Sequence, residues 1–199
     1  MVKMRRNAAC LLFCAPLLVW GIGEKDQFTP PDPAKMEKQT ISAVTISAQA
    51  FDTETLTKPP FGKANPIKYG ILPVWVHIKN GSQKAVKIDN ALFQYIDLDR
   101  RKIEATPAAE VKYANSPKRP NMRPNPLPIP RGKPKNPLEA FEIEGRALAA
   151  KMLPPGESAQ GFVYFQTDHR GSATLYITGL RDAASGEDLF YFEIPLPAN

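Results

Sequence analysis

Proline is the feature that most restricts what this chain can fold into. It supplies 21 of the 199 residues, which is double the usual share of ~5%. Each proline ring fixes φ and removes a backbone N–H donor, so a mainly helical fold is disfavoured. With 43% hydrophobic and 23% charged residues the chain has a globular composition, and we expect extended segments joined by stiff loops.

The first 23 residues have the layout of a secretory signal peptide. Three basic residues precede an apolar run over residues 8–20, and the small residues Gly21 and Gly23 follow it. This run is shorter than the ~20 residues needed to span a bilayer, and Pro16 would kink it. We expect an exported periplasmic or extracellular protein, cleaved near Gly23, with an uncleaved signal anchor or a lipid anchor as alternatives.

Removal of residues 1–23 changes the composition of the remaining chain. It leaves 176 residues (199 − 23) and no cysteine, because Cys10 and Cys14 both lie in the removed segment. The net charge falls from +6 to +3, since three basic residues leave and 23 basic and 20 acidic residues remain. We therefore expect no disulfide, no membrane span in the mature chain and no overall basic footprint for nucleic acid.

The rest of the chain divides into a leader and one domain. Residues 24–39 are polar, hold three prolines and show no apolar period, which predicts a flexible leader. Residues 40–199 form the predicted domain. Short β-branched or alternating runs predict its strands, at residues 40–48, 71–79, 85–98, 101–104, 159–167, 172–180 and 187–196.

Two details of this pattern carry further predictions. In the second run Leu72, Val74, Val76 and Ile78 recur at period two, so we expect them to face the core. Asn80-Gly81 follows directly and predicts a tight hairpin turn. A phase change near Asp89-Asn90 predicts a bulge or a break in the third run, whereas residues 51–65 read as turns.

The strand pattern predicts a fold class. About seven strands with turns at short intervals favour a mainly β, antiparallel immunoglobulin-like β-sandwich, with a proline-rich loop and one short helix inserted. Seven aromatic side chains of the last three strands are expected on its inner faces: Phe162, Tyr164, Phe165, Tyr176, Phe190, Tyr191 and Phe192.

The insertion begins with a basic proline-rich loop over residues 114–137. Its segment from Pro117 to Pro137 holds eight prolines, six basic residues and no acidic residue, which favours an extended polyproline-like conformation. The candidate interaction residues are its cations: Lys118, Arg119, Arg123, Arg131, Lys133 and Lys135. The loop is either a solvated spacer or a docking strip for a protein or an anionic envelope polymer; without an aromatic ring to stack on bases it is a poor nucleic-acid site.

A helix over residues 138–152 is predicted to follow the loop. Asn136 stands at the capping position and Pro137 at the first helical position. Leu138, Phe141, Leu148 and Met152 then keep a helical stripe.

Residues with catalytic or metal-binding chemistry are scarce. His77 is expected either to face solvent or to have its own hydrogen bonds satisfied on its strand. His169 lies in a predicted turn. Asp97 and Asp99 lie next to arginines in the sequence, and we interpret them as ion-pair partners. We interpret Glu139, Glu142 and Glu144 as the solvated side of a helix.

The sequence lacks the common nucleophile, nucleotide and metal motifs. We therefore expect no cofactor, no metal and no enzyme, with a carboxylate-dependent hydrolase as the alternative.

Two segments carry a resemblance to known proteins. Residues 69–80 (YGILPVWVHIKN), with 153–158 (LPPGES) leading into 161–165 (GFVYF), resemble exported bacterial proteins that have an immunoglobulin-like β-sandwich and no established molecular role. The resemblance extends over about residues 41–196 and implies the fold, but no site residue. We therefore expect an exported, non-enzymatic binding or structural module of the envelope or the extracellular space.

The loop interpretations make different predictions for a deletion of residues 116–135. We expect the melting temperature to stay nearly unchanged, because such a segment contributes little to a packed core. If the loop is a docking strip, salt-sensitive binding to cell-wall polymer or nucleic acid is lost with it. A binding assay at two salt concentrations checks this, and unchanged binding removes the docking interpretation.

Overall fold

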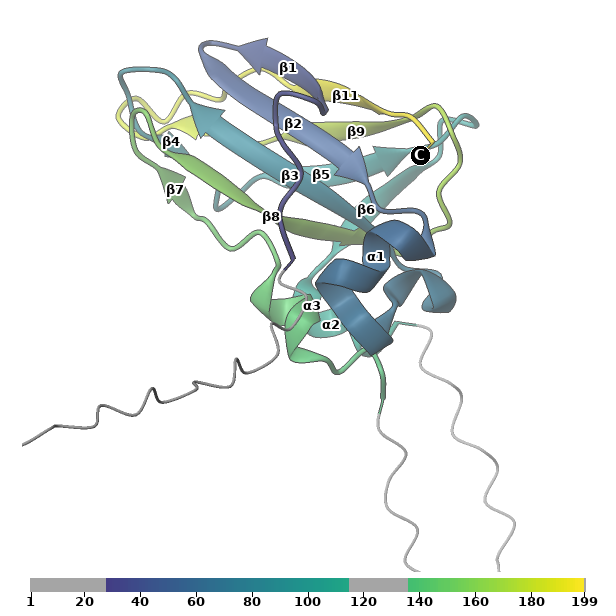
Figure 1. The fold of residues 1–199 in the computed structure, drawn as a ribbon. Helices are drawn as coiled ribbons and strands as arrows, with labels where there is room; N and C mark the ends of the chain where they lie inside the picture. The colour runs from purple at the N-terminus through teal and green to yellow at the C-terminus, as the bar shows by residue number, and fades with distance from the viewer. Residues whose placement is uncertain (1–27, 115–135, 199) are drawn as a thin grey trace, which may run out of the picture.

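The computed structural model describes residues 28–114 and 136–198, which form a mainly β structure with antiparallel strand pairing (Figure 1). Eight strands form one sheet in the order β1-β2-β3-β8-β6-β5-β9-β11, and three short strands form a second in the order β10-β4-β7. The larger sheet holds β1 (Glu37–Ile41), β2 (Val44–Ala50), β3 (Leu72–Asn80), β5 (Leu92–Ile96), β6 (Lys102–Thr106), β8 (Ser158–Phe165), β9 (Ala173–Thr178) and β11 (Phe192–Leu196). The smaller sheet holds β4 (Val86–Lys87), β7 (Met152–Leu153) and β10 (Arg181–Asp182). The expected signal peptide, residues 1–23, and most of the proline-rich loop lie outside the described residues.

The larger sheet curls until its first and last strands meet. β6 pairs with β8 through two residue pairs, Ala105 with Phe165 and Thr106 with Tyr164, and carries the sheet from one layer to the other (Figure 1). At the seam the Glu193 backbone N–H donates to Gln39 Oε1 at 2.6 Å. The mainly β, antiparallel class is confirmed; in place of a sandwich of about seven strands, the structure has a nearly closed, barrel-like sheet of eight.

Inward-facing side chains of the curled sheet form the main core. The four residues predicted for the core face of β3, Leu72, Val74, Val76 and Ile78, are each at most 1% exposed. Side chains at alternate positions of β2, β9 and β11 pack against them, as the period-two pattern requires. These are Val44, Ile46, Ala48, Ala50, Ala173, Leu175, Ile177, Phe192, Ile194 and Leu196.

Short helices cover the outer side of one layer with a second core (Figure 1). The helices are α1 (Glu54–Phe61), η1 (Gly62–Ala64), η2 (Pro66–Tyr69), α2 (Ala108–Val111) and α3 (Phe141–Gly145). Phe162 lies at the centre of this core, with ring centroids 4.8 Å from Trp75 and 5.0 Å from Phe51. Residues 51–65, expected as turns, thus include a helix, which the Thr53 side chain caps by accepting the Leu56 N–H.

Residues 28–39 of the expected flexible leader are packed against the domain. The Phe28 ring lies 5.4 Å from that of Trp75, and Met36 is buried in the same second core. Residues 37–39 already belong to β1. Although the segment is mostly polar, it contributes Phe28 and Met36 to the second core and its last residues to β1. The prediction of a flexible leader is therefore wrong for residues 28–39.

The first predicted strand, residues 40–48, is a hairpin in the structure. β1 and β2 pair from Ile41–Val44 outward, around a two-residue turn. Ser42 and Ala43 have φ values of 51° and 62°, the left-handed conformation that a type I′ turn requires at both positions. Neither glycine nor asparagine marks the turn, so no local residue pattern predicted it.

The chain does not form a hairpin at Asn80-Gly81. The Asn80 side chain is fully buried, and its Nδ2 donates to the carbonyl oxygens of Lys84, Leu153 and Pro154 at 2.7–3.1 Å. It ties the end of β3 to the small sheet, where β4 pairs with β7 and β10. Asn80 therefore serves as a buried hydrogen-bonding anchor, and the hairpin prediction is wrong.

The predicted helix over residues 138–152 is reduced to the five residues of α3. Beyond it the chain runs extended beside β8: the Leu148 N–H donates to the Phe162 carbonyl, and the Phe162 N–H donates to the Arg146 carbonyl. Backbone atoms of Ala147 and Leu148 lie so close to Gly161 that a Cβ atom there would clash. This approach to β8 satisfies the backbone in place of a longer helix.

The remaining strand predictions agree with the structure to within a few residues. The break near Asp89-Asn90 separates β4 from β5, and β6, β8, β9 and β11 lie within or beside their predicted runs. Of the seven aromatic residues expected inside, Phe165 and Phe192 are in the main core, and Phe162 and Tyr164 are in the second core. Phe190 and Tyr191 are exposed and Tyr176 is half-buried, which corrects that part of the prediction.

Gly161 offers a test of the packing of residues 146–148 on β8. We expect Gly161→Ala to lower the free energy of unfolding by about 2–3 kcal/mol, because backbone must move to admit the methyl group. Urea denaturation measures this change. Gly171→Ala is the matched control: there a Cβ atom meets only ordinary contacts, and we expect a change within about 0.5 kcal/mol. Equal effects of the two substitutions would contradict the close approach.

Candidate binding surface

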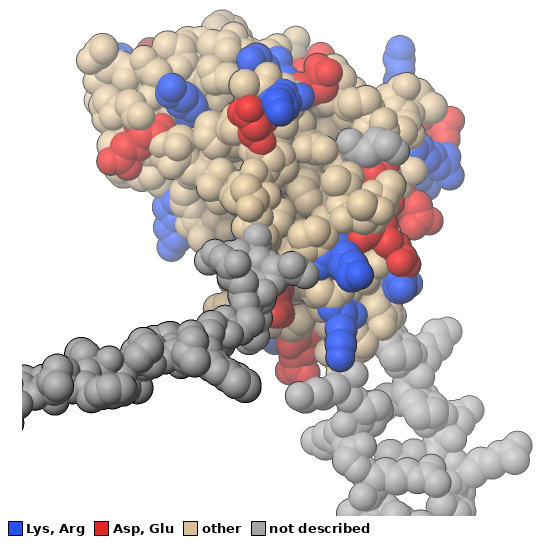
Figure 2. All heavy atoms as spheres, in the orientation of Figure 1, with Lys and Arg blue, Asp and Glu red and all other residues tan. Residues whose placement is uncertain are grey.

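The residues singled out in the sequence are dispersed in the structure. The six loop cations from Lys118 to Lys135 lie outside the described residues. Glu139, Glu142 and Glu144 are exposed, as predicted. On the face seen in Figure 2, basic and acidic side chains are interspersed, so the described residues visible there form no patch of a single sign.

Asp97 and Asp99 form ion pairs, as predicted. Asp99 Oδ2 lies 3.3 Å from Arg170 Nη1, and Asp97 Oδ2 lies 2.9 Å from Arg101 Nη2. Asp97 is more than a surface partner, because its buried carboxylate also accepts the Arg101 backbone N–H at 2.9 Å. This backbone hydrogen bond, aided by the Arg101 charge, lowers the pKa of Asp97. Its role is to hold the turn between β5 and β6.

His169 lies in a polar network that the sequence did not reveal. Its Nδ1 is 3.2 Å from the Tyr95 hydroxyl, and its Nε2 is 3.3 Å from the Pro197 carbonyl and 4.0 Å from Asp52 Oδ2. The network borders a hollow of about 350 Å³. Both ring nitrogens have protein partners and the side chain is only 2% exposed, so His169 fastens the C-terminal segment to β5.

His77 lies on the outer side of β3, between Ser47 of β2 and Gln160 of β8. It is half-buried, and in the described part of the chain its Nδ1 has no hydrogen-bond partner. Burial, and then the positive charge of Lys79, lower the pKa of His77. The expectation of a solvent-facing or satisfied histidine is therefore only partly met.

A cleft of about 510 Å³ separates the N-terminal segment from α1. Phe28 and Met36 line one side, Leu56 and Pro59 the other, and the end of β2 forms its floor. Phe28, in one wall of the cleft, is the first residue that the structure describes.

The second layer of the large sheet, opposite the helices, presents an uncovered outer side. Outward positions follow from the register: Gln94 of β5, Tyr176 of β9 and Glu193 of β11 stand in one row, beside Glu104 of β6. Leu92 and Thr178 stand next to that row on one side, and Lys102, Ile96, Thr174 and Pro195 on the other. We call these outward residues, together with Tyr191, the tyrosine face.

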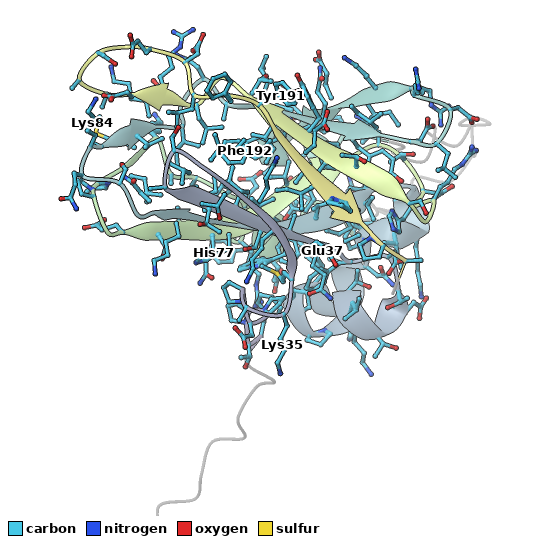
Figure 3. The ribbon with its side chains drawn as sticks, turned by 90° about the horizontal axis from the view of Figure 1, so that it is seen from above. Lys35, Glu37, His77, Lys84, Tyr191 and Phe192 are labelled. Carbon is cyan, nitrogen blue, oxygen red and sulfur yellow. The ribbon has the colours of Figure 1, made fainter. Side chains whose placement is uncertain are left out.

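Two tyrosines form the middle of the tyrosine face. The Tyr176 and Tyr191 rings lie 5.4 Å apart between centroids, and Lys102 Nζ lies 5.5 Å from the Tyr176 centroid. Tyr191 is 52% exposed and Leu92 is 59% exposed. In Figure 3, Tyr191 points outward from its layer whereas its neighbour Phe192 points between the two layers. Exposed aromatic and aliphatic groups inside a mixed-charge rim have the composition of a protein contact surface.

Other site types are not seen in the described part of the chain. No group of three or more histidine, cysteine or acidic side chains in residues 28–114 and 136–198 could hold a metal ion. None of the helices in those residues is long and apolar enough to cross a bilayer.

Comparison with known proteins gives structural neighbours alone. No family model and no curated protein matches the chain. The ycdA protein of Bacillus subtilis, assigned as a lipoprotein, has a TM-score of 0.39 at 12% identity; the match covers 80% of this chain and 38% of that protein. MPT63, a secreted protein of Mycobacterium tuberculosis, has a TM-score of 0.32 at 14% identity, covering 82% and 95% of the two chains. A DUF4426 family protein of Pseudomonas aeruginosa has a TM-score of 0.34 at 10% identity, and the match covers 83% of this chain and 98% of that protein. The chain thus resembles bacterial β proteins of which one is described as a lipoprotein and one as a secreted protein, and no residue role passes from them to this chain.

The lowered pKa of His77 predicts a pH dependence of stability. Because the folded state binds this proton less tightly than the unfolded state, its contribution is present above the unfolded pKa of ~6.5 and declines as the pH falls below it. We expect the free energy of unfolding to fall less between pH 7.5 and 5.5 in His77→Gln than in the parent chain. Chemical denaturation across this range tests it.

Lys79→Gln separates the two causes of the shift. It removes the second cause and leaves the burial of His77 in place, so its pH dependence should lie between those of the parent and of His77→Gln. If the free energy of unfolding changed equally with pH in all three proteins, His77 would not contribute to the pH dependence of stability.

Proposed function

We propose that the protein is an exported, non-enzymatic binding module and that the tyrosine face is its contact surface. The observation that carries the proposal is the unequal covering of the two layers. One layer buries its outer aromatics under helices, whereas the other leaves Tyr191 and Leu92 exposed to solvent. Exposed aromatic and aliphatic side chains that lie together on one surface are a feature of protein contact sites.

Export rests on the N-terminal pattern of basic residues, apolar run and small residues. The two facing layers also favour the interpretation of the curled sheet as a variant of the immunoglobulin-like sandwich, in which outward-facing residues alternate with those of the inner faces.

The side-chain chemistry favours binding over catalysis. His169 is enclosed by Tyr95 and Pro197, with both nitrogens engaged. Asp97 and Asp182 have lowered pKa values because they accept hydrogen bonds from Arg101 and Lys84, respectively. A carboxylic acid that donates a proton near neutral pH needs a raised pKa instead.

Binding can be tested by removing the aromatic rings. The chain without residues 1–23 is immobilised and used to capture partners from an envelope extract of the cells that produce it. We expect the double variant Tyr176→Ala/Tyr191→Ala to reduce capture at least about tenfold, since central aromatic residues dominate contact energies.

Tyr113→Ala is the matched control. Tyr113 is 73% exposed but lies on the helical side of the molecule, so its removal should leave capture unchanged. Equal capture by all three proteins would refute the tyrosine face as the contact surface.

A further inference from the structure

We propose that the tyrosine face binds a saccharide, namely an uncharged stretch of an envelope glycan that stacks on the two tyrosines. This inference rests on the proposed function, because it assigns a chemical class to the partner of the same surface. Three properties of the face carry it: its area, the pairing of its aromatic rings and the mixture of hydrogen-bonding groups around them.

The face is too small for a typical protein partner. Four strands about 4.8 Å apart and about 17 Å long give an area on the order of 300 Å². A standard protein interface buries about 800 Å² on each partner, and a symmetric dimer would need that area from each copy. A few sugar rings in a row need only a narrow strip of surface, so the face is large enough for an oligosaccharide.

The tyrosine pair supplies the apolar part of such a site. The rings of Tyr176 and Tyr191 lie 5.4 Å apart between centroids, and their planes are inclined by 31°. The two rings therefore form one aromatic unit. Because the face of an aromatic ring is electronegative, it attracts the C–H groups that cover one side of a sugar ring.

Tyr191 is the ring with the larger open surface. Lys102 Nζ lies 5.5 Å from the Tyr176 centroid, so Lys102 and Tyr191 each cover part of the Tyr176 ring. Tyr191 is 52% exposed, whereas Tyr176 is half-buried. The main stacking contact is therefore assigned to Tyr191, and Tyr176 holds that ring in place.

Hydrogen-bonding groups of three kinds surround the rings. One row across β6, β5, β9 and β11 consists of Glu104, Gln94, Tyr176 and Glu193, and Lys102 stands two residues from Glu104 on β6. A carboxylate only accepts hydrogen bonds, an ammonium group only donates them, and an amide does both. Each sugar hydroxyl both donates and accepts, so one saccharide can satisfy all three kinds of group.

The charges of the face do not suit a partner of a single sign. Lys102, Glu104 and Glu193 are exposed, and none of them forms an ion pair with another described residue. An anionic partner would meet the two carboxylates, and a cationic partner would meet the lysine beside them. Contacts between like charges are costly in an interface, and a ligand without net charge avoids them.

These properties predict weak binding that is insensitive to salt. A short oligosaccharide with one main stacking contact and hydrogen bonds at an open surface should have a dissociation constant of about 0.1–1 mM. Because the ligand is uncharged, raising the NaCl concentration from about 0.05 M to about 0.5 M should change the dissociation constant less than about twofold.

Protein-free glycan from the envelope of the producing cells is the probe. The insoluble glycan that remains after boiling in detergent and protease digestion is tested by cosedimentation. The soluble polysaccharide of a hot phenol–water extract is tested by affinity electrophoresis. We expect at least one of these fractions to bind the exported chain, and we expect hydrolysis of its glycosidic bonds in hot acid to abolish that binding.

Variants of Tyr191 separate stacking from other effects. Tyr191→Ala removes the ring and should raise the dissociation constant at least about tenfold. Tyr191→Phe is the matched control: it keeps the ring face and should stay within about threefold of the parent chain. Circular dichroism verifies that both variants are folded. Equal binding by the parent and Tyr191→Ala overturns the proposal.

Glu193→Gln tests the charge of the ligand. It removes one charge but keeps an acceptor oxygen, so binding of an uncharged glycan should change less than about threefold. A larger loss, together with a strong dependence on salt, identifies a cationic partner and overturns the saccharide.

Capture from the whole envelope extract keeps this proposal apart from the proposed function. If capture requires Tyr176 and Tyr191 but neither glycan fraction binds, the partner is a protein; the saccharide is then excluded and the proposed function stands. If neither capture nor glycan binding depends on the tyrosines, both proposals fail.

Discussion

The structure depends on β3, a strand that is buried on both sides from Leu72 to Val76. Its inner side chains, such as Val74 and Val76, are fully enclosed by the main core. On its outer side Trp75 is 4% exposed, beneath Phe28 and beside Phe162. β3 also pairs along its length with β2 and β8. Burial on both sides removes more apolar surface from water than any edge strand can, so the rest of the molecule is arranged around it.

This arrangement gives the two layers different outer sides. The layer that contains β3 needs a cover for its aromatic residues, and α1, α3 and the segment from Phe28 supply one. The layer of β5, β9 and β11 has polar outward residues such as Gln94 and Glu193, and no helix covers it. Leu92, Tyr176 and Tyr191 interrupt this polar pattern, which is why their position suggests contact with another molecule rather than folding of this one.

Local alternation was sufficient to predict β3, β8 and β9, because period-two burial is encoded within each strand. The features that were missed depend on distant parts of the chain or lack a marker residue. Ser42 and Ala43 form a positive-φ turn without glycine or asparagine, and Asn80 is an anchor whose partners are as far away as Pro154. The helical stripe after Asn136 competed with pairing to Phe162, which no local pattern shows.

The candidate surface was partly within reach of the sequence. Leu175 and Ile177 mark the inner side of β9, so Tyr176 between them had to face outward; the density of aromatic residues obscured this alternation. The register that sets Glu193 and Gln94 beside Tyr176 is a tertiary property. The network of His169 with Tyr95 likewise joins residues 74 positions apart.

Native-state hydrogen exchange, resolved by residue, tests the central role of β3 most directly. Amides of β3 that pair with β2 and β8 should exchange only through global unfolding, with the highest protection in the chain. Amides of β1 and of the small sheet should exchange earlier through local opening. Protection of β3 no greater than that of β1 would contradict the account.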